Sequence, residues 1–379
     1  MKVVYLARFL PAEGSTLHLY ALAEGMVRRG HAATVVSAGP GPDSDALDLY
    51  RASIDAGVGH VRIGFPLRPT FTTVGKLRQF GRYMCVLPAA LAALHRARPD
   101  VIHVHYPVTS YIAVIFSRLS GTPTVVTHHA MGITRHPLNR RVQAAIAISQ
   151  ELHDELTFTY GYAPDAVTTI FNGVDRHKFQ PPSDVERRQA RSEYGIDEST
   201  VLIGFVGRLN EVKGVDLLLE ASGPILGPAV HLVLVGGTSE EAAGLIGALP
   251  DNVRRYIFHR PFTSNVREAY AALDICALAS RREGFALSSV EAMMMGLPVV
   301  RSRTGGADTQ VLDRTTGILV PVNDVLALRA ALQELVSMSP EQRRGMGRLA
   351  AERASRMFSS QGMIEKTFDL YSRLLARRS

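Results

Sequence analysis

Apolar runs alternate with amphipathic stretches along the first half of the chain. Residues 3–6 are apolar, and residues 17–27 repeat apolar side chains at helical spacing until Gly30, a residue typical of helix ends. The pattern predicts further strands at 31–37, 101–105 and 124–127, with a helix at 110–119. Strands separated by helices in this way predict a parallel sheet covered by helices.

The same alternation starts afresh in the second half. It predicts strands at 201–206, 230–235, 256–258, 275–278, 299–300 and 318–320, and helices near 216–221, 265–272, 287–295 and 325–336. Residues 172–197 are rich in proline and charge without an apolar period, so we place a linker there, at about 179–182. After Pro340 the chain is predicted to be helical to its end, with apolar anchors at Phe358, Phe368, Tyr371 and Leu374.

These patterns predict an α/β protein with two doubly wound, Rossmann-like domains that face each other across a cleft. The predicted parts are an N-terminal domain at 1–178, a C-terminal domain at 179–355 and a last helix at 356–379. Open sheets of this type bind ligands at the carboxyl ends of their strands. We therefore expect the functional residues to follow strands.

Composition excludes several classes of protein. Among the 379 residues, 46% are hydrophobic and 20% are charged, which excludes wholesale disorder. Two cysteines, Cys85 and Cys276, are too few for a disulfide framework or a zinc site built on cysteines. The first eight residues are more typical of a strand than of a secretory leader, and no apolar stretch is long enough for a membrane helix. We expect a cytoplasmic protein.

Basic residues are concentrated in the first half. The net charge is +7, and residues 1–180 hold 18 basic against 12 acidic side chains. Between residues 56 and 99 there is no acidic side chain, and the basic ones there are Arg62, Arg68, Lys76, Arg78, Arg82, Arg96 and Arg98. Such a surface attracts an anionic ligand or an anionic membrane, or it is a solvated helix face. No nucleic-acid motif accompanies the charge, so nucleic acid is not expected as a partner.

The most specific pattern in the sequence is a pair of acidic residues, Glu283 and Glu291, around the start of a predicted helix. Between them, the backbone N–H groups of Phe285, Ala286 and Leu287 are the unpaired donors of a helix N-terminus. Such donors suit phosphate or sugar oxygens. The carboxylates gain nothing beside phosphate, but they can accept hydrogen bonds from the hydroxyl groups of a ribose or a hexose.

With this pair, the chain resembles the retaining nucleotide-sugar glycosyltransferases of the GT-B fold, in the large family 4 group. The resemblance also rests on Arg208, Lys213-Gly214 and Gly305-Gly306. It extends over segments 172–175, 205–209, 296–300 and 316–321, and so covers nearly the whole second half. It implies that the last helix crosses back to the first domain.

The resemblance implies a role for each matching residue of the second half. Arg208 and Lys213 match the paired cations that hold the donor diphosphate and stabilise the charge that leaves with it. Glu291 matches the acid that accepts the ribose hydroxyls. Glu283 matches the acid close to the transferred sugar, and residues 285–287 supply the backbone donors beside it.

In the first half, segment 123–129 resembles the family segment that ends in an active-site histidine, and its spacing favours His129. The implied role is to contact the donor hexose and support the developing oxocarbenium ion. Two other interpretations stay open: a metal cluster of His103, His105, His128 and His129, or histidines with a structural role only. The first loop departs from the family, because it has one glycine, Gly14, where many relatives have two.

The resemblance implies transfer of a hexose or N-acetylhexosamine from a nucleoside-diphosphate sugar to an acceptor hydroxyl, with retention of configuration and no cofactor or metal. UDP-sugars are favoured over GDP-sugars as donors. The acceptor is expected to be a small aminocyclitol or secondary-metabolite sugar, or a lipid-linked or phosphorylated glycan. With a lipid-linked acceptor, the basic stretch at 62–98 would place the protein peripherally on an anionic membrane.

Three other functions occur on the same two-domain architecture. A nucleotide-sugar 2-epimerase would use the same phosphate contacts. A non-catalytic sugar-nucleotide sensor would keep the fold, although retention of Arg208, Lys213, Glu283 and Glu291 argues against it. A nicotinamide dehydrogenase is disfavoured because no G-x-G-x-x-G follows the first strand.

Overall fold

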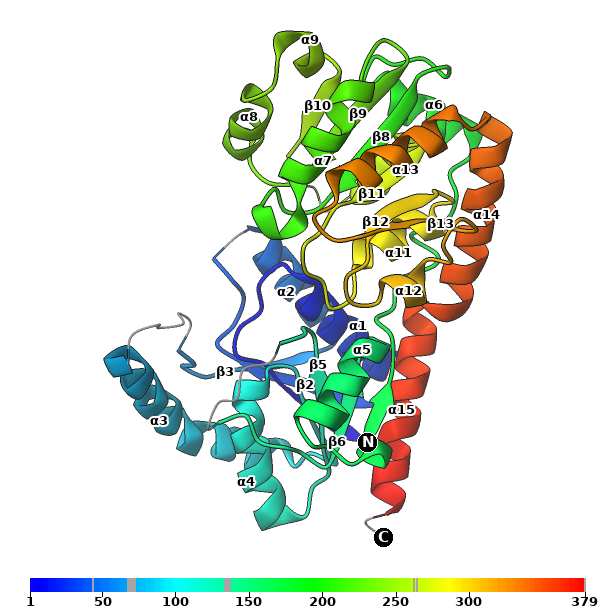
Figure 1. Cartoon of the computed structure of the whole chain (residues 1–379). Coiled ribbons are helices and arrows are strands. Elements are labelled where there is room, and N and C mark those ends of the chain that lie inside the picture. Colours follow the sequence, from blue (N-terminus) through cyan, green and yellow to red (C-terminus); the bar gives the residue numbers. More distant parts are fainter. Residues whose placement is uncertain (43, 67–72, 133–137, 262, 264, 378–379) are drawn as a thin grey trace. The chain divides into compact units, whose positions relative to one another are not determined.

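The computed structural model in Figure 1 describes residues 1–42, 44–66, 73–132, 138–261, 263 and 265–377, with side chains described outside 73–79. The chain forms two compact units. The N-terminal unit comprises Met1–Asn172 and Ser360–Ser379, and the C-terminal unit comprises Gly173–Ser359. Each unit is an α/β sandwich built on a parallel sheet.

The sheet of the N-terminal unit has the order β3-β2-β1-β4-β5-β6-β7, with every neighbouring pair parallel. Its strands are β1 (Lys2–Leu6), β2 (Ala32–Ser37), β3 (Gly59–Arg62), β4 (Val101–Val104), β5 (Thr124–His128), β6 (Ala144–Ala147) and β7 (Val167–Thr169). Its helices are α1 (Gly14–Arg28), α2 (Ser44–Asp55), α3 (Thr73–Ala97), α4 (Ser110–Ser120), α5 (Gln150–Asp154) and α15 (Ser360–Ala376).

The sheet of the C-terminal unit has the order β10-β9-β8-β11-β12-β13 and is also parallel. Its strands are β8 (Val201–Val206), β9 (Val230–Val235), β10 (Ile257–Arg260), β11 (Ile275–Leu278), β12 (Val299–Ser302) and β13 (Gly317–Val320). Its helices are α6 (Asp184–Ser192), α7 (Val215–Ser222), α8 (Ser239–Gly247), α9 (Asp251–Arg254), α10 (Val266–Ala272), α11 (Leu287–Met294), α12 (Ala307–Gln310), α13 (Val325–Ser337) and α14 (Pro340–Met357).

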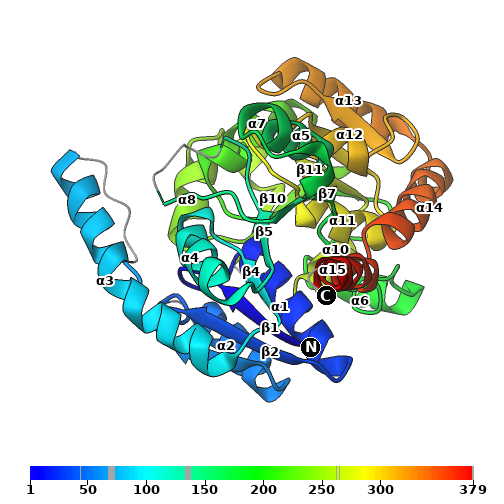
Figure 2. The same ribbon diagram turned by 90° about the horizontal axis from the view of Figure 1, so that it is seen from below.

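Helix α15 completes the core of the N-terminal unit. Both ribbon views place it beside α1 (Figures 1 and 2), and the two helices pack against each other. The contact is close because α1 carries Gly25, where a Cβ atom would lie 2.6 Å from a methyl group of Ile364. Tyr371 and Leu374 of α15 are buried in the same cluster as Val3 of β1. The last helix is thus an integral layer of this unit.

The boundaries of the units differ from those predicted at 178/179 and 355/356. The chain passes from one unit to the other at 172/173 and returns at 359/360. Residues just after 172 belong with the C-terminal unit because the N–H of Val174 donates to the carbonyl of Phe358 over 2.8 Å, and Phe179 packs edge-on against Tyr270. The linker therefore lies earlier in the chain than the position at about 179–182 that we predicted from composition.

The stretch interpreted as a linker contains a helix, α6. Ser183 caps it through a capping box with Glu186. Arg191 of α6 is 1% exposed, and its guanidinium donates to Asp274 over 3.1 Å and to the carbonyls of Ala272 and Asp197. The helix escaped prediction because it is anchored by buried arginine rather than by an apolar stripe.

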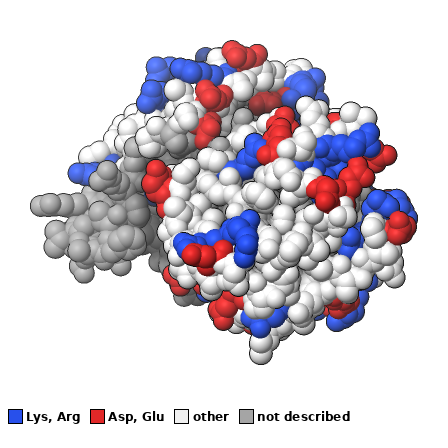
Figure 3. Space-filling view, turned by 90° about the horizontal axis from the view of Figure 1, so that it is seen from above, with Lys and Arg blue, Asp and Glu red and all other residues white. Residues whose placement is uncertain are grey.

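Charges are mixed on the face of the C-terminal unit that Figure 3 shows, where basic and acidic groups alternate. Of the predicted basic stretch, Arg62, Arg82, Arg96 and Arg98 are exposed on the N-terminal unit, whereas Arg68 and the side chains of Lys76 and Arg78 lie outside the described residues. None of the helices in the described part of the chain is both long and apolar enough to cross a membrane.

Candidate active site

The loop after β8 carries the two predicted cations of the C-terminal unit. Arg208 is exposed, and Lys213 ends a short 3-10 turn, η4 (Glu211–Lys213). The side-chain oxygen of Asn210 caps this turn by accepting the N–H of Lys213 over 3.1 Å. The turn places Lys213 at the carboxyl end of the central strand, which is the edge of the sheet where α/β proteins bind ligands.

Lys213 forms an ion pair with Glu283, 70 residues further along the chain. Its Nζ lies 2.6 Å from Oε1 of Glu283, and the hydroxyl of Ser280 donates to the same oxygen over 2.8 Å. The two side chains are 19% and 10% exposed, so the pair is largely screened from water. The structure thus brings together a predicted phosphate-binding cation and a predicted sugar-binding acid.

Arg281 joins the two loops that carry this pair. Its backbone N–H donates to the carbonyl of Val212 over 2.8 Å, and its guanidinium makes two hydrogen bonds to Asp216 of α7, at 2.6 and 2.8 Å. A two-point contact of this kind fixes orientation as well as distance. Arg281 therefore holds the turn of Lys213 against the turn of Glu283.

Gly214 lets the two loops approach closely. It adopts φ of +65°, and a Cβ atom there would overlap the carbonyl of Ala279. A left-handed conformation costs a non-glycine residue roughly 1–2 kcal/mol even without a clash. Glycine is therefore required beside Lys213.

We expect Gly214→Ala to lower the free energy of unfolding by at least about 1–2 kcal/mol. Gly244 in α8 is a matched control, because a Cβ atom there has open space and alanine favours a helix. Urea denaturation of both variants measures the difference. A wild-type midpoint for Gly214→Ala would contradict the close approach of the two loops.

A buried polar network holds the backbone of residues 285–287 in position. Phe285 and Ala286 are buried, and α11 starts at Leu287. Arg301 of β12, 1% exposed, donates to the side-chain oxygen of Gln310 and, over 3.0 Å, to the hydroxyl of Thr304. Gln310 in turn donates to the carbonyl of Ala286 over 3.1 Å. Sequence reasoning missed Arg301 and Gln310.

Gly305 is part of the same arrangement. A Cβ atom there would lie 2.5 Å from the carbonyl oxygen of Glu283. Gly305 of the predicted Gly305-Gly306 pair is therefore needed, because the loop after β12 packs directly on the backbone of Glu283.

Glu291 lies inside α11 with part of its side chain accessible. The hydroxyl of Tyr270 in α10 donates to its Oε2 over 2.9 Å. Burial raises the pKa of the Glu291 carboxyl, while the Tyr270 hydrogen bond and the charge of Lys178 act in the opposite direction. Glu291 is the fifth residue of α11, and within the described part of the chain the hydrogen bond from Tyr270 leaves its Oε1 without a partner.

In the N-terminal unit, His129 follows β5 and packs among other histidines. Its Nε2 lies 3.1 Å from Nδ1 of His105, and its ring meets that of His18 edge-on at 4.9 Å between centroids. Burial holds the pKa of His129 well below its usual value, so the ring is neutral near pH 7. His18, in the second turn of α1, was not predicted.

The histidines do not form the metal cluster considered above. Within the described part of the chain, the group with metal-binding spacing is His18, His105 and His129, with ligand atoms within 4.8 Å of one another. His103 instead contacts Tyr371 of α15 at 2.5 Å and Thr127 at 2.7 Å. Metal independence of the reaction stays a prediction.

Gly14 is the first residue of α1, after the loop that follows β1. The residue that precedes the helix is Glu13, whose side chain makes no capping hydrogen bond. The carbonyl of Glu13 accepts the N–H groups of Thr16 and Leu17, each over 3.0 Å.

Comparison with known proteins matches both halves of the chain. Residues 12–178 match the family model described as Glycosyltransferase Family 4, and residues 200–338 match the model described as Glycosyl transferases group 1. A D-inositol 3-phosphate glycosyltransferase of Saccharomonospora viridis is 31% identical over 310 residues, which cover 73% of this chain and 70% of the relative. One of Xylanimonas cellulosilytica is 31% identical, with 78% of each chain covered.

Solved structures share the fold. The Anabaena protein Alr3699/HepE in complex with UDP and glucose has a TM-score of 0.79 and 21% identity over 98% of this chain and 99% of its own. Sucrose-phosphate synthase from Thermosynechococcus elongatus has a TM-score of 0.78 and 19% identity over the full length of both chains. With its two parallel-sheet units and these relatives, the chain belongs to glycosyltransferase family 4 and is a glycosyltransferase of the GT-B fold.

Proposed function

We propose that the enzyme transfers a hexose or N-acetylhexosamine from a UDP-sugar to a hydroxyl of a small phosphorylated acceptor, with retention of configuration. The Lys213–Glu283 ion pair carries the proposal, because it sets a cation and a hydroxyl acceptor side by side, and Arg208 belongs to the same loop as Lys213. The neighbour with UDP and glucose supports the donor, and the name D-inositol 3-phosphate glycosyltransferase of several relatives supports a phosphorylated cyclitol as acceptor.

Lys213 is suited to bind both Glu283 and the donor diphosphate. An ammonium group has three N–H donors, and Glu283 takes one of them at 2.6 Å. Two remain for phosphate oxygens. As the sugar–phosphate bond breaks, negative charge grows on the leaving UDP, and a fixed cation in a partly dry site stabilises that charge most strongly.

Glu291 and residues 285–287 would orient the rest of the donor. Oε1 of Glu291 accepts a ribose hydroxyl, while Tyr270 keeps the carboxyl in place. The N–H groups at the start of α11 face oxygen atoms of the donor, and the Arg301–Gln310 network fixes their position. Glu283 binds hydroxyls of the transferred sugar.

His129 and Gly14 would act from the N-terminal unit. A neutral imidazole can accept or donate a hydrogen bond, so His129 can contact a hydroxyl of the hexose while the oxocarbenium character develops. The first turn of α1, starting at Gly14, offers N–H groups to the donor.

The anomeric configuration is retained because the acceptor hydroxyl attacks the same face of the sugar from which UDP departs. The acceptor oxygen bonds to the anomeric carbon as the bond to the β-phosphate oxygen breaks, and the leaving phosphate takes the acceptor proton. Among the carboxylates of this site, Glu283 is the candidate for a covalent alternative, but the ammonium of Lys213 and the hydroxyl of Ser280 both bind its Oε1. Such engagement weakens a nucleophile and favours direct attack.

A panel of nucleotides tests the donor preference. At about 100 times its Kd, a nucleotide that binds the folded form raises stability by about 2.7 kcal/mol, which shifts the melting temperature by roughly 5–10 °C for a unit of this size. We expect UDP to give the largest shift among UDP, GDP, ADP and dTDP. A larger shift with GDP would overturn the UDP assignment, and no shift with any of them would overturn the nucleotide site.

A donor-only assay separates transfer from its rivals. A 2-epimerase would release an epimer from the UDP-sugar without an acceptor, and a sensor would leave the donor intact. We expect slow hydrolysis of the donor alone and faster UDP release when D-inositol 3-phosphate is added. Activity unaffected by EDTA would support the absence of a metal.

A further inference from the structure

His128 is buried on the opposite side of β5 from the histidine cluster. Successive side chains of a strand point to opposite faces, so His128 is directed away from Thr127. It is 4% exposed, and neither of its ring nitrogens has a hydrogen-bond partner among the described residues. A buried polar ring without a partner costs stability unless something binds it.

His128 lines a recess of the N-terminal unit together with two arginines. The lining residues are Pro107, Ser110, Val126, His128, Asn139, Arg140, Arg141, Tyr160 and Tyr162. No carboxylate is among them, whereas Arg140 and Arg141 bring two positive charges. Helix α4 starts at Ser110, so the positive end of its dipole lies at the same recess.

The segment that carries the arginines is fixed by hydrogen bonds on both sides. The backbone N–H of Arg140 donates to the hydroxyl of Ser110 over 2.6 Å, and Ser110 is 1% exposed. The N–H of Val142 donates to the hydroxyl of Tyr162 over 3.2 Å. The recess is therefore organised in advance for a ligand and does not depend on a rearrangement of its backbone.

Charge and size both select a small anion. Burial lowers the pKa of His128 to about 4, so near pH 7 its ring is neutral and offers one N–H donor and one acceptor. The arginines supply the charge. The recess has a volume of about 30 Å³, and since a single water needs roughly 10–15 Å³ by the same measure, its inner part suits a small anionic group rather than a sugar ring.

We propose that this recess binds the phosphate group of the acceptor, with Arg140 and Arg141 as the charged contacts and His128 as a hydrogen-bonding partner. The inference deepens the proposed function, since it assumes a phosphorylated acceptor, and it names the residues that would distinguish such an acceptor from its unphosphorylated form.

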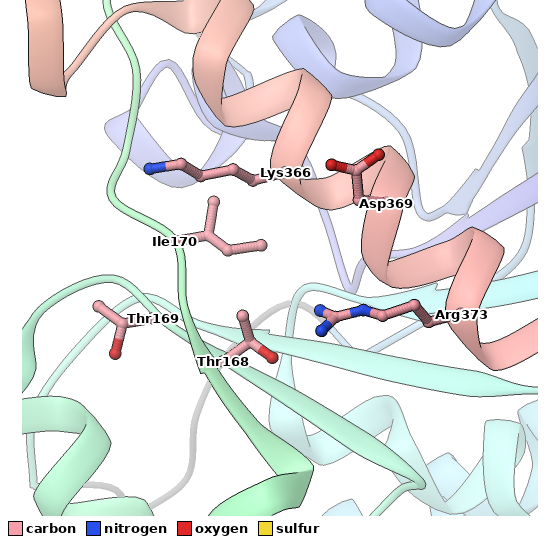
Figure 4. Close-up of a pocket in the computed structure, with 6 residues that line it drawn as sticks. All are labelled: Thr168, Thr169, Ile170, Lys366, Asp369 and Arg373. Atoms are coloured by element: carbon pink, nitrogen blue, oxygen red, sulfur yellow. The ribbon is translucent and has the colours of Figure 1, made fainter.

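A larger recess of the same unit provides a contrast. It lies between the β7 edge and α15, with a volume of about 310 Å³, and is lined by Thr168, Thr169, Ile170, Lys366, Asp369 and Arg373 (Figure 4). Here a carboxylate, Asp369, accompanies the two basic groups, so an anion would meet repulsion as well as attraction. Lys366 therefore serves as a matched control for the arginines.

Isothermal titration with inorganic phosphate tests the site without any need for activity. We expect wild-type protein to bind phosphate, and Arg140→Ala and Arg141→Ala to weaken binding at least about tenfold, because each removes a charge-assisted contact. Both arginines are exposed, so these variants should fold. Lys366→Ala should bind as wild type. Absence of binding by wild type, or equal loss in Lys366→Ala, would overturn the assignment.

A second titration distinguishes the phosphate group of an acceptor from free inorganic phosphate as the ligand of the recess. Wild type should bind D-inositol 3-phosphate more tightly than inositol or inorganic phosphate, and Arg140→Ala with Arg141→Ala should remove most of the preference over inositol. Equal affinity for D-inositol 3-phosphate and inorganic phosphate would overturn the acceptor role. If the binding pattern holds but no sugar is transferred, the phosphate site stands and the proposed reaction fails.

Discussion

Lys213→Ala should lower kcat by about 10²–10³-fold, with a smaller change in KM for the donor. The reason is that negative charge on the diphosphate grows towards the transition state, and removal of one preorganised stabilising group costs about this much. Steady-state kinetics with a UDP-sugar and an acceptor measures the effect, once the thermal-shift panel has established the donor.

The control for Lys213→Ala is Arg314→Ala, which breaks an exposed ion pair with Glu334 in the same unit. It should leave kcat unchanged. Because Lys213 and Glu283 are in contact, the double variant with Glu283→Ala should lose much less than the product of the two single losses. Wild-type turnover in both single variants would show that this ion pair is not part of the active site.

Glu291→Gln should raise the KM for the donor by about 10–100-fold and change kcat little. A hydrogen bond to a charged group contributes about 1.5–3 kcal/mol, and the substitution removes the charge without changing the shape of the side chain. Glu334→Gln, on the surface of α13, is the control. A KM equal to that of wild type would show that the ribose does not bind Glu291.

The raised pKa of Glu291 predicts that donor binding depends on pH. Burial raises the pKa of Glu291 above the usual value for glutamate, so its charge, and with it donor binding, is lost at a higher pH than an exposed glutamate would allow. The Tyr270 hydrogen bond favours the charged form. Tyr270→Phe should therefore move the rise in donor KM to still higher pH, whereas Glu291→Gln should show no such rise.

Strands were the most predictable part of the fold. The central strands, such as Val201–Val206 and Ile275–Leu278, are buried on both faces, so their apolar runs are continuous, and each predicted strand agrees with the structure to within two residues. Both edges of the N-terminal sheet were missed, β3 at one side and β6 with β7 at the other. Strand β6 consists of Ala144–Ala147, three alanines and an isoleucine, and β7 has three residues, too few for a clear pattern.

The contacts within the site join residues that are far apart in the sequence, and these contacts could not be predicted. Lys213 and Glu283 were predicted from their resemblance to known enzymes, but no local pattern indicates that they form an ion pair. Arg301 escaped notice because the strand was predicted to end at residue 300 and an arginine after an apolar strand is normally a surface residue, whereas β12 includes Arg301 and its partner Gln310 lies in a different element. His128 was grouped with His129 by proximity in sequence, although the two belong to different surroundings.

A crystal structure of the enzyme with UDP is the most direct test of the donor site. We expect a ribose hydroxyl to lie within hydrogen-bond distance of the Glu291 carboxyl and the β-phosphate to contact Lys213 and Arg208. A ribose placed away from Glu291, or a diphosphate bound without either cation, would contradict this expectation.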